Sequence, residues 1–322
     1  MKIGMIFPGY GSQFVGMCKE LYDSSRLVQE YFEEASNCLN SNLIKLCFAS
    51  SDAELSKIQN AYPAIFLVGS SIATLLKQEG IEPQVVAGYN TGEYAALFTA
   101  KGMSFPDGLY LLNKYAILYQ EFLDELKDFE VVRVAGIVAQ ELELLCKDIR
   151  DSGAAVHIAV QVTPTEHIVA GLVSAVERVR VQLDGKGVKI KAASSEIGLH
   201  SQLMDPVIGR LSMYLEKVDF HDLAMPCISS IDGQAMSSKD SVKAHIINHI
   251  NNPVCWPHVL TQLESCDCIL EIGPGNSLYS IAQAWYPNKQ ILTINKPEDI
   301  EIVKSVCIKQ EKNPVELIDE QI

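Results

Sequence analysis

The sequence predicts an α/β protein in which a small α+β unit interrupts a larger α/β unit. Residues 85–88 form a short apolar run that passes through a sharp turn into the helical spacing of residues 94–100. Strand, turn and helix in this order are typical of an elbow at the edge of a sheet. Residues 131–193 then alternate as strand, helix, strand, strand, helix and strand. This second order is the split βαβ unit of a ferredoxin-like domain.

The larger unit is expected to begin with a buried strand at residues 3–7, because an apolar run there is closed by Pro8 and Gly9. Apolar residues at helical spacing predict three further helices, and a last apolar run before Gly273 predicts another strand. From Lys296 onward the chain is charged and irregular, which indicates a peripheral tail. The predicted helices are 15–37, 64–78 and 109–126, and the last strand is 268–272.

In the small unit, β-branched runs predict the strands and amphipathic spacing predicts the helices. We therefore expect a large domain over residues 1–126 and 196–300, an inserted ferredoxin-like domain over 127–195, and a C-terminal tail over 301–322. The strands expected in the small unit are 131–138, 155–162, 168–171 and 188–193, and its helices are 140–149 and 174–183.

Composition narrows the class of protein. The chain has 322 residues, of which 48% are hydrophobic and 20% charged, so it can bury a full core. Its 26 basic against 40 acidic residues give a net charge of −14, which argues against binding nucleic acid. No apolar run approaches the ~20 residues that cross a bilayer. We expect a monomer or weak oligomer that does not enter membranes.

Cysteine usage points to a reducing compartment. The nine cysteines are scattered, and the closest pair, Cys266 and Cys268, has one residue between its members, which does not fit the usual spacing of zinc ligands. The start of the chain lacks the pattern of a secretory signal. We expect a cytoplasmic protein without a metal site or cofactor.

Five short motifs occur in one order along the chain. Residues 7–13 read F-P-G-Y-G-S-Q, 88–94 read G-Y-N-T-G-E-Y, and 199–204 read L-H-S-Q-L-M. Residues 252–256 and 271–275 read N-P-V-C-W and E-I-G-P-G. Together they resemble the malonyl-CoA:acyl carrier protein transacylase family, whose motifs include F-P-G-Q-G-S-Q and the elbow G-H-S-x-G-E-Y. The resemblance implies an α/β-hydrolase-like large domain with a ferredoxin-like insertion.

Family membership implies transfer of an acyl group from CoA to a serine and then to the thiol of an acyl carrier protein. A serine needs a base that takes its proton and amides that stabilise the oxyanion. At the serine position this chain has Asn90, whose amide cannot form an acyl ester. The family's arginine that pairs with the malonyl carboxylate corresponds to Tyr115. The family activity, acyl-carrier-protein S-malonyltransfer, is therefore not expected by the serine mechanism.

Other polar positions of the family site have also changed. Tyrosines replace the elbow histidine at Tyr89, the first glutamine of the opening motif at Tyr10, and a further glutamine at Tyr62. In the small unit, the family's N-x-N-S-P-x-Q stretch corresponds to residues 160–166, with two valines and a glutamate. The tyrosines either fill a site that no longer needs to be open or hold a different ligand. We favour filling.

The resemblance leaves one catalytic side chain in place. His200 matches the family's base, with Leu199 beside it in the pocket, and the family contacts the other ring nitrogen through a backbone carbonyl that corresponds to His249. Thr91 follows the nucleophile position and is expected to supply an oxyanion amide with Tyr10 nearby. A shifted nucleophile at Thr91 is the less favoured alternative. Ser12 is expected to cap a helix after the glycine turn.

A basic island occurs just before His200 in an otherwise acidic chain. Carrier proteins are acidic, so the island is a candidate contact for a carrier protein or for the phosphates of CoA. A solvated helix end and strand edge is an equally good interpretation. Its residues are Arg178, Arg180, Lys186, Lys189 and Lys191.

Two classes of function follow. In the first, the chain is a pseudoenzyme that binds an acyl carrier protein or an acyl-CoA-like ligand in fatty-acid or polyketide metabolism. In the second, it is a thioester hydrolase or an acyltransferase for uncharged acyl groups, in which His200 activates water or another nucleophile. We favour the first, because the polar groups around His200 have been lost with the serine.

Overall fold

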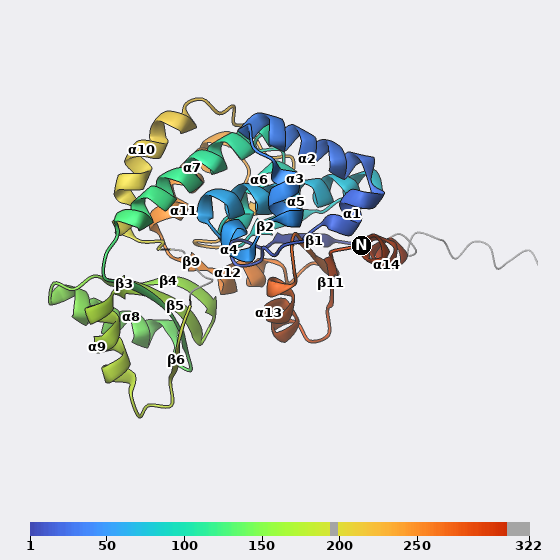
Figure 1. Cartoon of the computed structure of the whole chain (residues 1–322). Coiled ribbons are helices and arrows are strands. Elements are labelled where there is room, and N and C mark those ends of the chain that lie inside the picture. The colour runs from blue at the N-terminus through green and yellow to red at the C-terminus, as the bar shows by residue number, and fades with distance from the viewer. Residues whose placement is uncertain (194–198, 308–322) are drawn as a thin grey trace, which may run out of the picture.

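A computed structural model describes residues 1–193 and 199–307. Its larger part is built on a six-stranded sheet of order β11-β10-β1-β2-β7-β8, in which neighbours run parallel except for the antiparallel pair β7 and β8 (Figure 1). The strands are β1 (Ile3–Phe7), β2 (Val85–Gly88), β7 (Cys227–Ile228), β8 (Ala235–Met236), β10 (Cys268–Ile272) and β11 (Gln290–Ile294). The strands expected at 3–7, 85–88 and 268–272 are confirmed.

Helices cover both faces of this sheet, as a parallel sheet requires. Successive strand residues point to opposite faces, so Met5 and Phe7 enter one core and Ile6 enters the other. The first core is closed by α2 (Arg26–Leu39), α5 (Ile58–Gln78), α6 (Gly92–Thr99) and α7 (Phe105–Glu125). The second is closed by α12 (Trp256–Gln262) and α13 (Ser277–Trp285).

The remaining helices lie at the margins of the larger part. They are α1 (Lys19–Ser24), α3 (Leu43–Ala49), α4 (Asp52–Leu55), the 3₁₀ turn η1 (Gln202–Met204), α10 (Asp205–Leu215), α11 (Lys239–Asn251) and α14 (Pro297–Cys307). Among these, α11 becomes important below because it carries two buried histidines.

The smaller part has the predicted order of elements. Its sheet has the order β6-β3-β5-β4-β9, and two helices pack on it over a separate apolar core. The short β9 comes from the larger part and runs parallel to β4, which joins the two parts. The elements are β3 (Phe129–Ala135), α8 (Ala139–Asp151), β4 (Val156–Thr163), β5 (Glu166–Leu172), α9 (Val173–Leu183), β6 (Lys189–Ala192) and β9 (Val254–Cys255). We propose the division at residues 127 and 195 that the sequence suggests.

The helix predicted over residues 15–37 is wrong as one element. The chain forms two helices that meet at Ser25, which has an extended backbone and accepts the Val28 N–H with its hydroxyl. A serine at this position ends one helix and caps the next. The helix predicted to begin at residue 64 starts earlier, at Ile58, so Pro63 lies inside the helix, where its missing N–H leaves one carbonyl of the preceding turn without its usual partner.

The irregular tail expected from Lys296 onward is also wrong for residues 297–307, which form α14. Ile300 and Val303 lie on its inner face and are buried, while Lys304 forms a salt bridge of 2.6 Å with Glu79 at the C-terminal end of α5. Charged residues on the outer face hid this short amphipathic pattern in the sequence. The rest of the predicted tail lies outside the described residues.

Candidate active site

Asn90 stands on the elbow between β2 and α6, with a left-handed backbone at φ 54°. Asparagine tolerates this conformation better than most residues. The turn is tight: a Cβ added at Gly92 would lie 2.1 Å from the Phe7 carbonyl oxygen, and one at Gly88 would lie 2.1 Å from the Glu93 nitrogen. The elbow backbone is therefore intact although its side chain is an amide.

Asn90 and His200 contact each other directly. Asn90 Nδ2 lies 3.1 Å from His200 Nε2, and His200 Nδ1 lies 2.8 Å from the backbone oxygen of His249. A carbonyl can only accept, so Nδ1 carries a hydrogen. Burial lowers the pKa of His200, which keeps the ring neutral. Nε2 is then an acceptor, and the Asn90 amide donates to it.

In this chain of hydrogen bonds, the basic nitrogen of His200, Nε2, already accepts a hydrogen bond from the Asn90 amide. In a serine enzyme the base receives a proton from the nucleophile, whereas the Asn90 amide has no ionisable proton at neutral pH. Both groups are buried, with 7% of Asn90 and 3% of His200 exposed. A water that used His200 as a base would first have to displace the Asn90 amide.

One backbone N–H group at the expected oxyanion site is also paired within the chain. The N–H of Tyr10 donates to Thr91 Oγ1 at 3.1 Å, so this donor is not free for a developing oxyanion. From the sequence we expected the Thr91 amide to matter, and the hydrogen bond between the Thr91 hydroxyl and the Tyr10 N–H was not predicted. The hydroxyl side chain directly after the elbow residue was the feature that could have indicated this bond.

The expectation that Ser12 caps a helix is wrong. Its hydroxyl donates to the Gly9 carbonyl at 2.7 Å, and the next helix, α1, begins only at Lys19. Ser12 instead closes the glycine turn that precedes the elbow.

Tyrosine rings fill the space beside Asn90 and His200. The ring centroid of Tyr62 lies 5.9 Å from that of Tyr10 and 5.8 Å from that of Tyr115, and all three side chains are almost completely buried. Tyr119 stacks on Tyr115 at 5.7 Å, and its hydroxyl accepts the Leu199 N–H at 3.1 Å. Sequence reasoning missed Tyr119, although it lies one helical turn after Tyr115. The packing supports our preference for filled space.

Tyr89 does not join these rings. It packs edge-on against Trp256, with centroids 5.4 Å apart, toward the second core. A cavity of about 100 Å³ lies between Tyr89, Tyr10 and the residues Arg133 and Val162 of the small part. Sites for small ligands usually measure about 300–1,000 Å³, so this space is too small for an acyl thioester without movement.

Behind the elbow lies a buried ionic cluster that the sequence analysis did not find. Glu93 Oε2 is 2.7 Å from His245 Nε2 and 3.6 Å from His249 Nδ1, and Glu93 Oε1 accepts the Ser230 N–H. Burial opposes ionisation of Glu93, but the neighbouring His245 and these hydrogen bonds outweigh it and lower the pKa of Glu93. Burial also opposes charging of His245, yet Glu93 raises its pKa. The signal was two histidines four residues apart on one helix.

The histidines predict how stability depends on pH. Burial lowers the pKa of His157, His167 and His200, and that of His249 to about 3, from ordinary values of 6.5. The unfolded chain therefore binds more protons at these groups as the pH falls below 6.5, which destabilises the fold. Burial raises the pKa of Glu271 from 4.5 to about 7, and Glu93 raises the pKa of His245 above 6.5, so each of these two groups opposes the effect with one proton.

We therefore expect the free energy of unfolding to fall between pH 6.5 and about 5, by up to about 1.4 kcal/mol per pH unit for each net proton. Urea titrations at several pH values measure it. His249→Gln keeps the backbone carbonyl and should flatten the slope. A free energy that stays constant or rises toward pH 5 would contradict the assignment of neutral buried histidines.

Comparison with known proteins agrees with this fold and site. A family model described as the acyl transferase domain matches residues 5–290. The chain belongs to this family. It is 29% identical to the malonyl CoA-acyl carrier protein transacylase of Bacillus subtilis over 97% of this chain and 99% of the relative, and 26% identical to that of Escherichia coli over 92% and 96%.

Solved acyltransferase structures superpose on most of the chain. The malonyl CoA-acyl carrier protein transacylase of Coxiella burnetii gives a TM-score of 0.89 at 26% identity, with 94% of this chain and 96% of that chain covered. A malonyl-transacylase solved in complex with a type II polyketide acyl-carrier protein gives 0.88 at 25% identity, with 95% and 100% covered. The expected α/β-hydrolase-like fold with its insertion is confirmed.

The motifs of this acyl transferase family member now have structural explanations. The Glu271 carboxylate of E-I-G-P-G accepts the N–H groups of Leu278 and Tyr279 and so caps α13. The N-P-V segment provides β9, which joins the small sheet, and the following Trp256 is fully buried.

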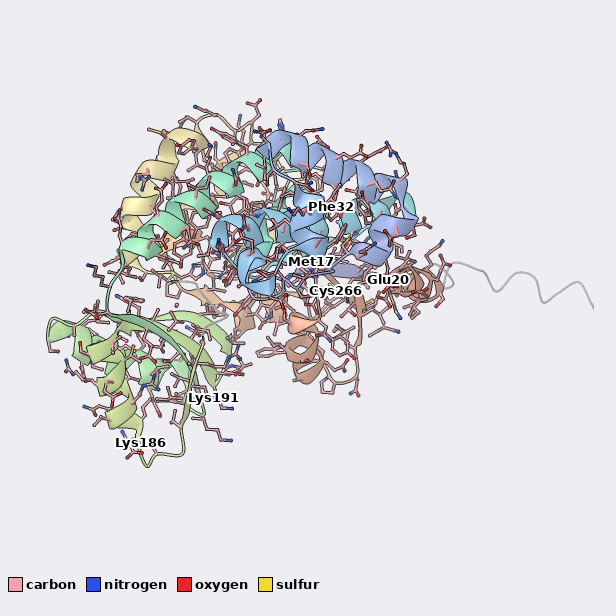
Figure 2. All side chains as sticks on the ribbon, in the orientation of Figure 1. Met17, Glu20, Phe32, Lys186, Lys191 and Cys266 are labelled. Atoms are coloured by element: carbon pink, nitrogen blue, oxygen red, sulfur yellow. The ribbon has the colours of Figure 1, made fainter. Side chains whose placement is uncertain are left out.

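The five basic residues divide into two groups. Arg180 pairs with Glu130 and Glu177, and Arg178 donates to the Ser152 hydroxyl at 2.6 Å. The three lysines are exposed at the edge of the small sheet. Figure 2 shows Lys186 in the turn before β6 and Lys191 on β6 itself. The lysines, together with the exposed Arg178, are thus the accessible part of the island.

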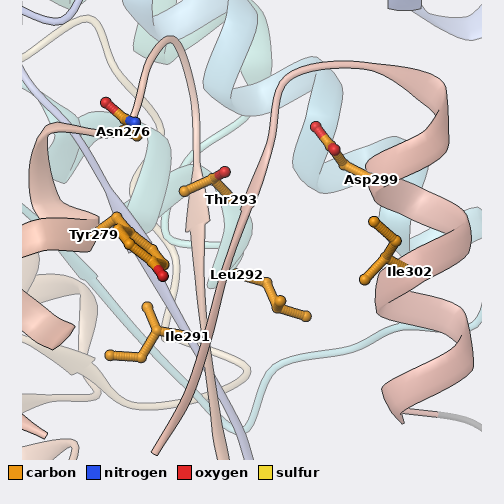
Figure 3. Close-up of a pocket in the computed structure, with 7 residues that line it drawn as sticks. All are labelled: Asn276, Tyr279, Ile291, Leu292, Thr293, Asp299 and Ile302. Atoms are coloured by element: carbon orange, nitrogen blue, oxygen red, sulfur yellow. The ribbon is translucent and has the colours of Figure 1, made fainter. Parts of the chain in front are cut away.

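A cavity of about 340 Å³ lies elsewhere, between the edge strand β11 and helices α13 and α14 (Figure 3). Asn276, Thr293 and Asp299 lie at one end, and Tyr279 with the aliphatic residues lies at the other. Asp299 already accepts the N–H groups of Asn295 and Lys296. This cavity has no connection with the Asn90 site.

Among residues 1–193 and 199–307, no group of three or more His, Cys, Asp or Glu side chains is arranged to hold a metal ion. Within the same residues, no helix combines the length and the apolar character needed to span a membrane.

Proposed function

We propose that this acyltransferase homologue acts in the cytoplasm as a pseudoenzyme that binds an acyl carrier protein and does not carry out serine-dependent malonyl transfer. The observation that carries the proposal is the hydrogen bond from Asn90 to His200. It occupies the base with a group that cannot become an acyl ester. The paired Tyr10 amide and the buried tyrosines support the same conclusion.

The lysines of the small part support the choice of partner. The related malonyl-transacylase was solved in complex with its acyl-carrier protein. In this chain Lys186, Lys189 and Lys191 form an accessible positive strip on a protein of net charge −14. Such a strip would attract an acidic carrier protein at long range, and acyl transfer is not required for this binding.

The test uses the wild-type protein with malonyl-CoA, with acetyl-CoA and with an acyl carrier protein of the same organism. We expect no added acyl mass in intact-protein mass spectrometry and no release of CoA thiol, together with saturable binding of the carrier protein. Lys186→Glu with Lys189→Glu and Lys191→Glu should weaken this binding about tenfold or more and make it less sensitive to salt. Lys45→Glu with Lys101→Glu and Lys217→Glu, which reverses three exposed charges on the larger part, is the matched control.

A second candidate function is thioester hydrolysis. It is favoured by the bond between His200 Nδ1 and the His249 carbonyl, which keeps the ring in the tautomer that a general base needs. Release of CoA thiol without acyl mass, lost in His200→Ala, would support hydrolysis and overturn the pseudoenzyme. A stable acyl adduct on the wild-type protein would contradict both proposals.

A further inference from the structure

A polar cavity of about 520 Å³ lies between α11 and the hairpin of β7 and β8, on a different side of α11 from the tyrosine cluster. Its volume falls within the range of about 300–1,000 Å³ that small-molecule sites occupy. The polar residues that line it include Ser229, Asp232, Gln234, Ser241, His245 and Asn248.

The helical wall of this cavity is a polar stripe. Ser241, His245 and Asn248 follow one another at spacings of four and three residues, so they share one face of α11, and Asn252 lines the cavity just after the helix ends. A stripe of this kind beside a sheet is usually apolar. Here the polar groups face an open space instead of a packed core.

The hairpin wall is held in shape by its own hydrogen bonds. Ser229 Oγ accepts the N–H groups of Ile231 and Asp232, and Asp232 Oδ1 accepts the N–H of Gln234 at 3.0 Å. The carboxylate of Asp232 is thus fixed at the rim by the turn. A preformed wall lowers the entropic cost of binding a ligand.

His245 forms the floor and has one nitrogen to spare. The residue is 6% exposed, and its Nε2 is used by Glu93. Within the described part of the chain, His245 Nδ1 and the side-chain amides of Gln234 and Asn248 have no hydrogen-bond partner. Nδ1 is not among the fully enclosed unpaired atoms, and His245 lines the cavity, so this nitrogen faces the open space.

The charges around the cavity do not cancel. Glu93 and His245 form a neutral pair beneath the floor, which leaves the carboxylate of Asp232. The lining residues include no lysine or arginine. The cavity therefore favours a cation over an anion. A hydroxyl group suits Nδ1 of His245, because it can donate or accept whichever way the ring is protonated.

We propose that this cavity binds a small hydroxylated amine. Its ammonium group pairs with Asp232, one hydroxyl bonds to His245 Nδ1, and further hydroxyls bond to the amides of Asn248 and Gln234. The proposal does not depend on the proposed function. A ligand in this cavity would nevertheless lie close to the candidate active site. Asn248 directly precedes His249, whose backbone carbonyl accepts a hydrogen bond from His200.

The test is calorimetric titration at about pH 6, where the amine is protonated, with D-glucosamine as the probe and D-glucose as the uncharged match. We expect glucosamine to bind about tenfold more tightly than glucose, since a charged hydrogen bond contributes about 1.5–3 kcal/mol. Histidine NMR should show the resonance of His245 shifting with saturation.

Two variants test the contributions of the two walls of the cavity separately. Asp232→Asn should bring glucosamine down to the affinity of glucose, and Asp240→Asn, which removes the same charge outside the cavity on α11, should change nothing. Asn248→Ala on the opposite wall should weaken both sugars by a similar factor, which tests the cavity even if Asp232→Asn alters the hairpin. Absence of saturable glucosamine binding, equal affinity for the two sugars, or unchanged binding in both variants would overturn the proposal.

Discussion

The double variant Asn90→Ser with Thr91→Val is expected to acquire an acyl group from acetyl-CoA about 100-fold faster than Asn90→Ser alone. Serine restores a nucleophile next to His200. In the single variant, however, the Tyr10 N–H still donates to the Thr91 hydroxyl at 3.1 Å and is not available to the oxyanion. Removal of one oxyanion donor costs about 100- to 1,000-fold in a protease, so release of this donor should have an effect of the same order.

Valine is suited to this position because it keeps the branched shape of threonine and replaces the hydroxyl, which accepts the Tyr10 N–H, with a methyl group. Single-turnover mass spectrometry of the intact protein measures the acyl adduct. Thr99→Val in the Asn90→Ser background is the control, since the Thr99 hydroxyl bonds to the Ala95 carbonyl further along α6. Equal rates for the single and double variants would show that the Tyr10 amide is not the missing donor.

Acetyl-CoA is the better donor for this experiment because the pocket has no cation at the family's carboxylate position. Tyr115 stacks on Tyr119 there. The adjacent Lys114 lies over the rings of Tyr110 and Tyr214 instead of entering the site. We expect malonyl-CoA to react more slowly than acetyl-CoA in the double variant, because its carboxylate would be buried without a partner.

The sequence predicted the fold well because local patterns and tertiary structure agree in the strands. The runs at 85–88 and 268–272 are buried on both faces and, apart from Glu271, apolar throughout, which is typical of short central parallel strands. The prediction failed where a single polar residue sets the boundary between two helices, as Ser25 does. It also failed where charged residues surround a narrow apolar stripe, as in α14.

The sequence predicted only those site residues that lie within recognisable motifs. Asn90, His200 and the His249 carbonyl lie together as the motif order suggested. The pair of Glu93 and His245 was not foreseeable, because 152 positions separate its members and no local pattern reports a buried partner. The two roles of Thr91 were equally hidden, since the choice between amide and hydroxyl depends on which backbone group lies opposite.

Loss of His245 is expected to destabilise the protein more than any surface substitution. His245→Leu leaves the Glu93 carboxylate 3% exposed and without its closest cation. Removal of one partner from a buried ion pair typically costs about 3–5 kcal/mol, because the remaining charge stays desolvated. We expect a loss of this size in the free energy of unfolding, measured by urea titration near neutral pH.

The double variant Glu93→Leu with His245→Leu distinguishes charge from packing. If the buried carboxylate causes the loss, removing it should recover a large part of the stability that His245→Leu costs. The exposed pair of Lys243 and Glu216 serves as a control, and Lys243→Ala should cost about 1 kcal/mol or less. A double variant no more stable than His245→Leu would show that the histidine acts mainly by filling space. A double variant that is more stable than the wild-type protein would mean that the ionic pair beneath the elbow is kept at a cost to stability, as expected of a group retained for binding.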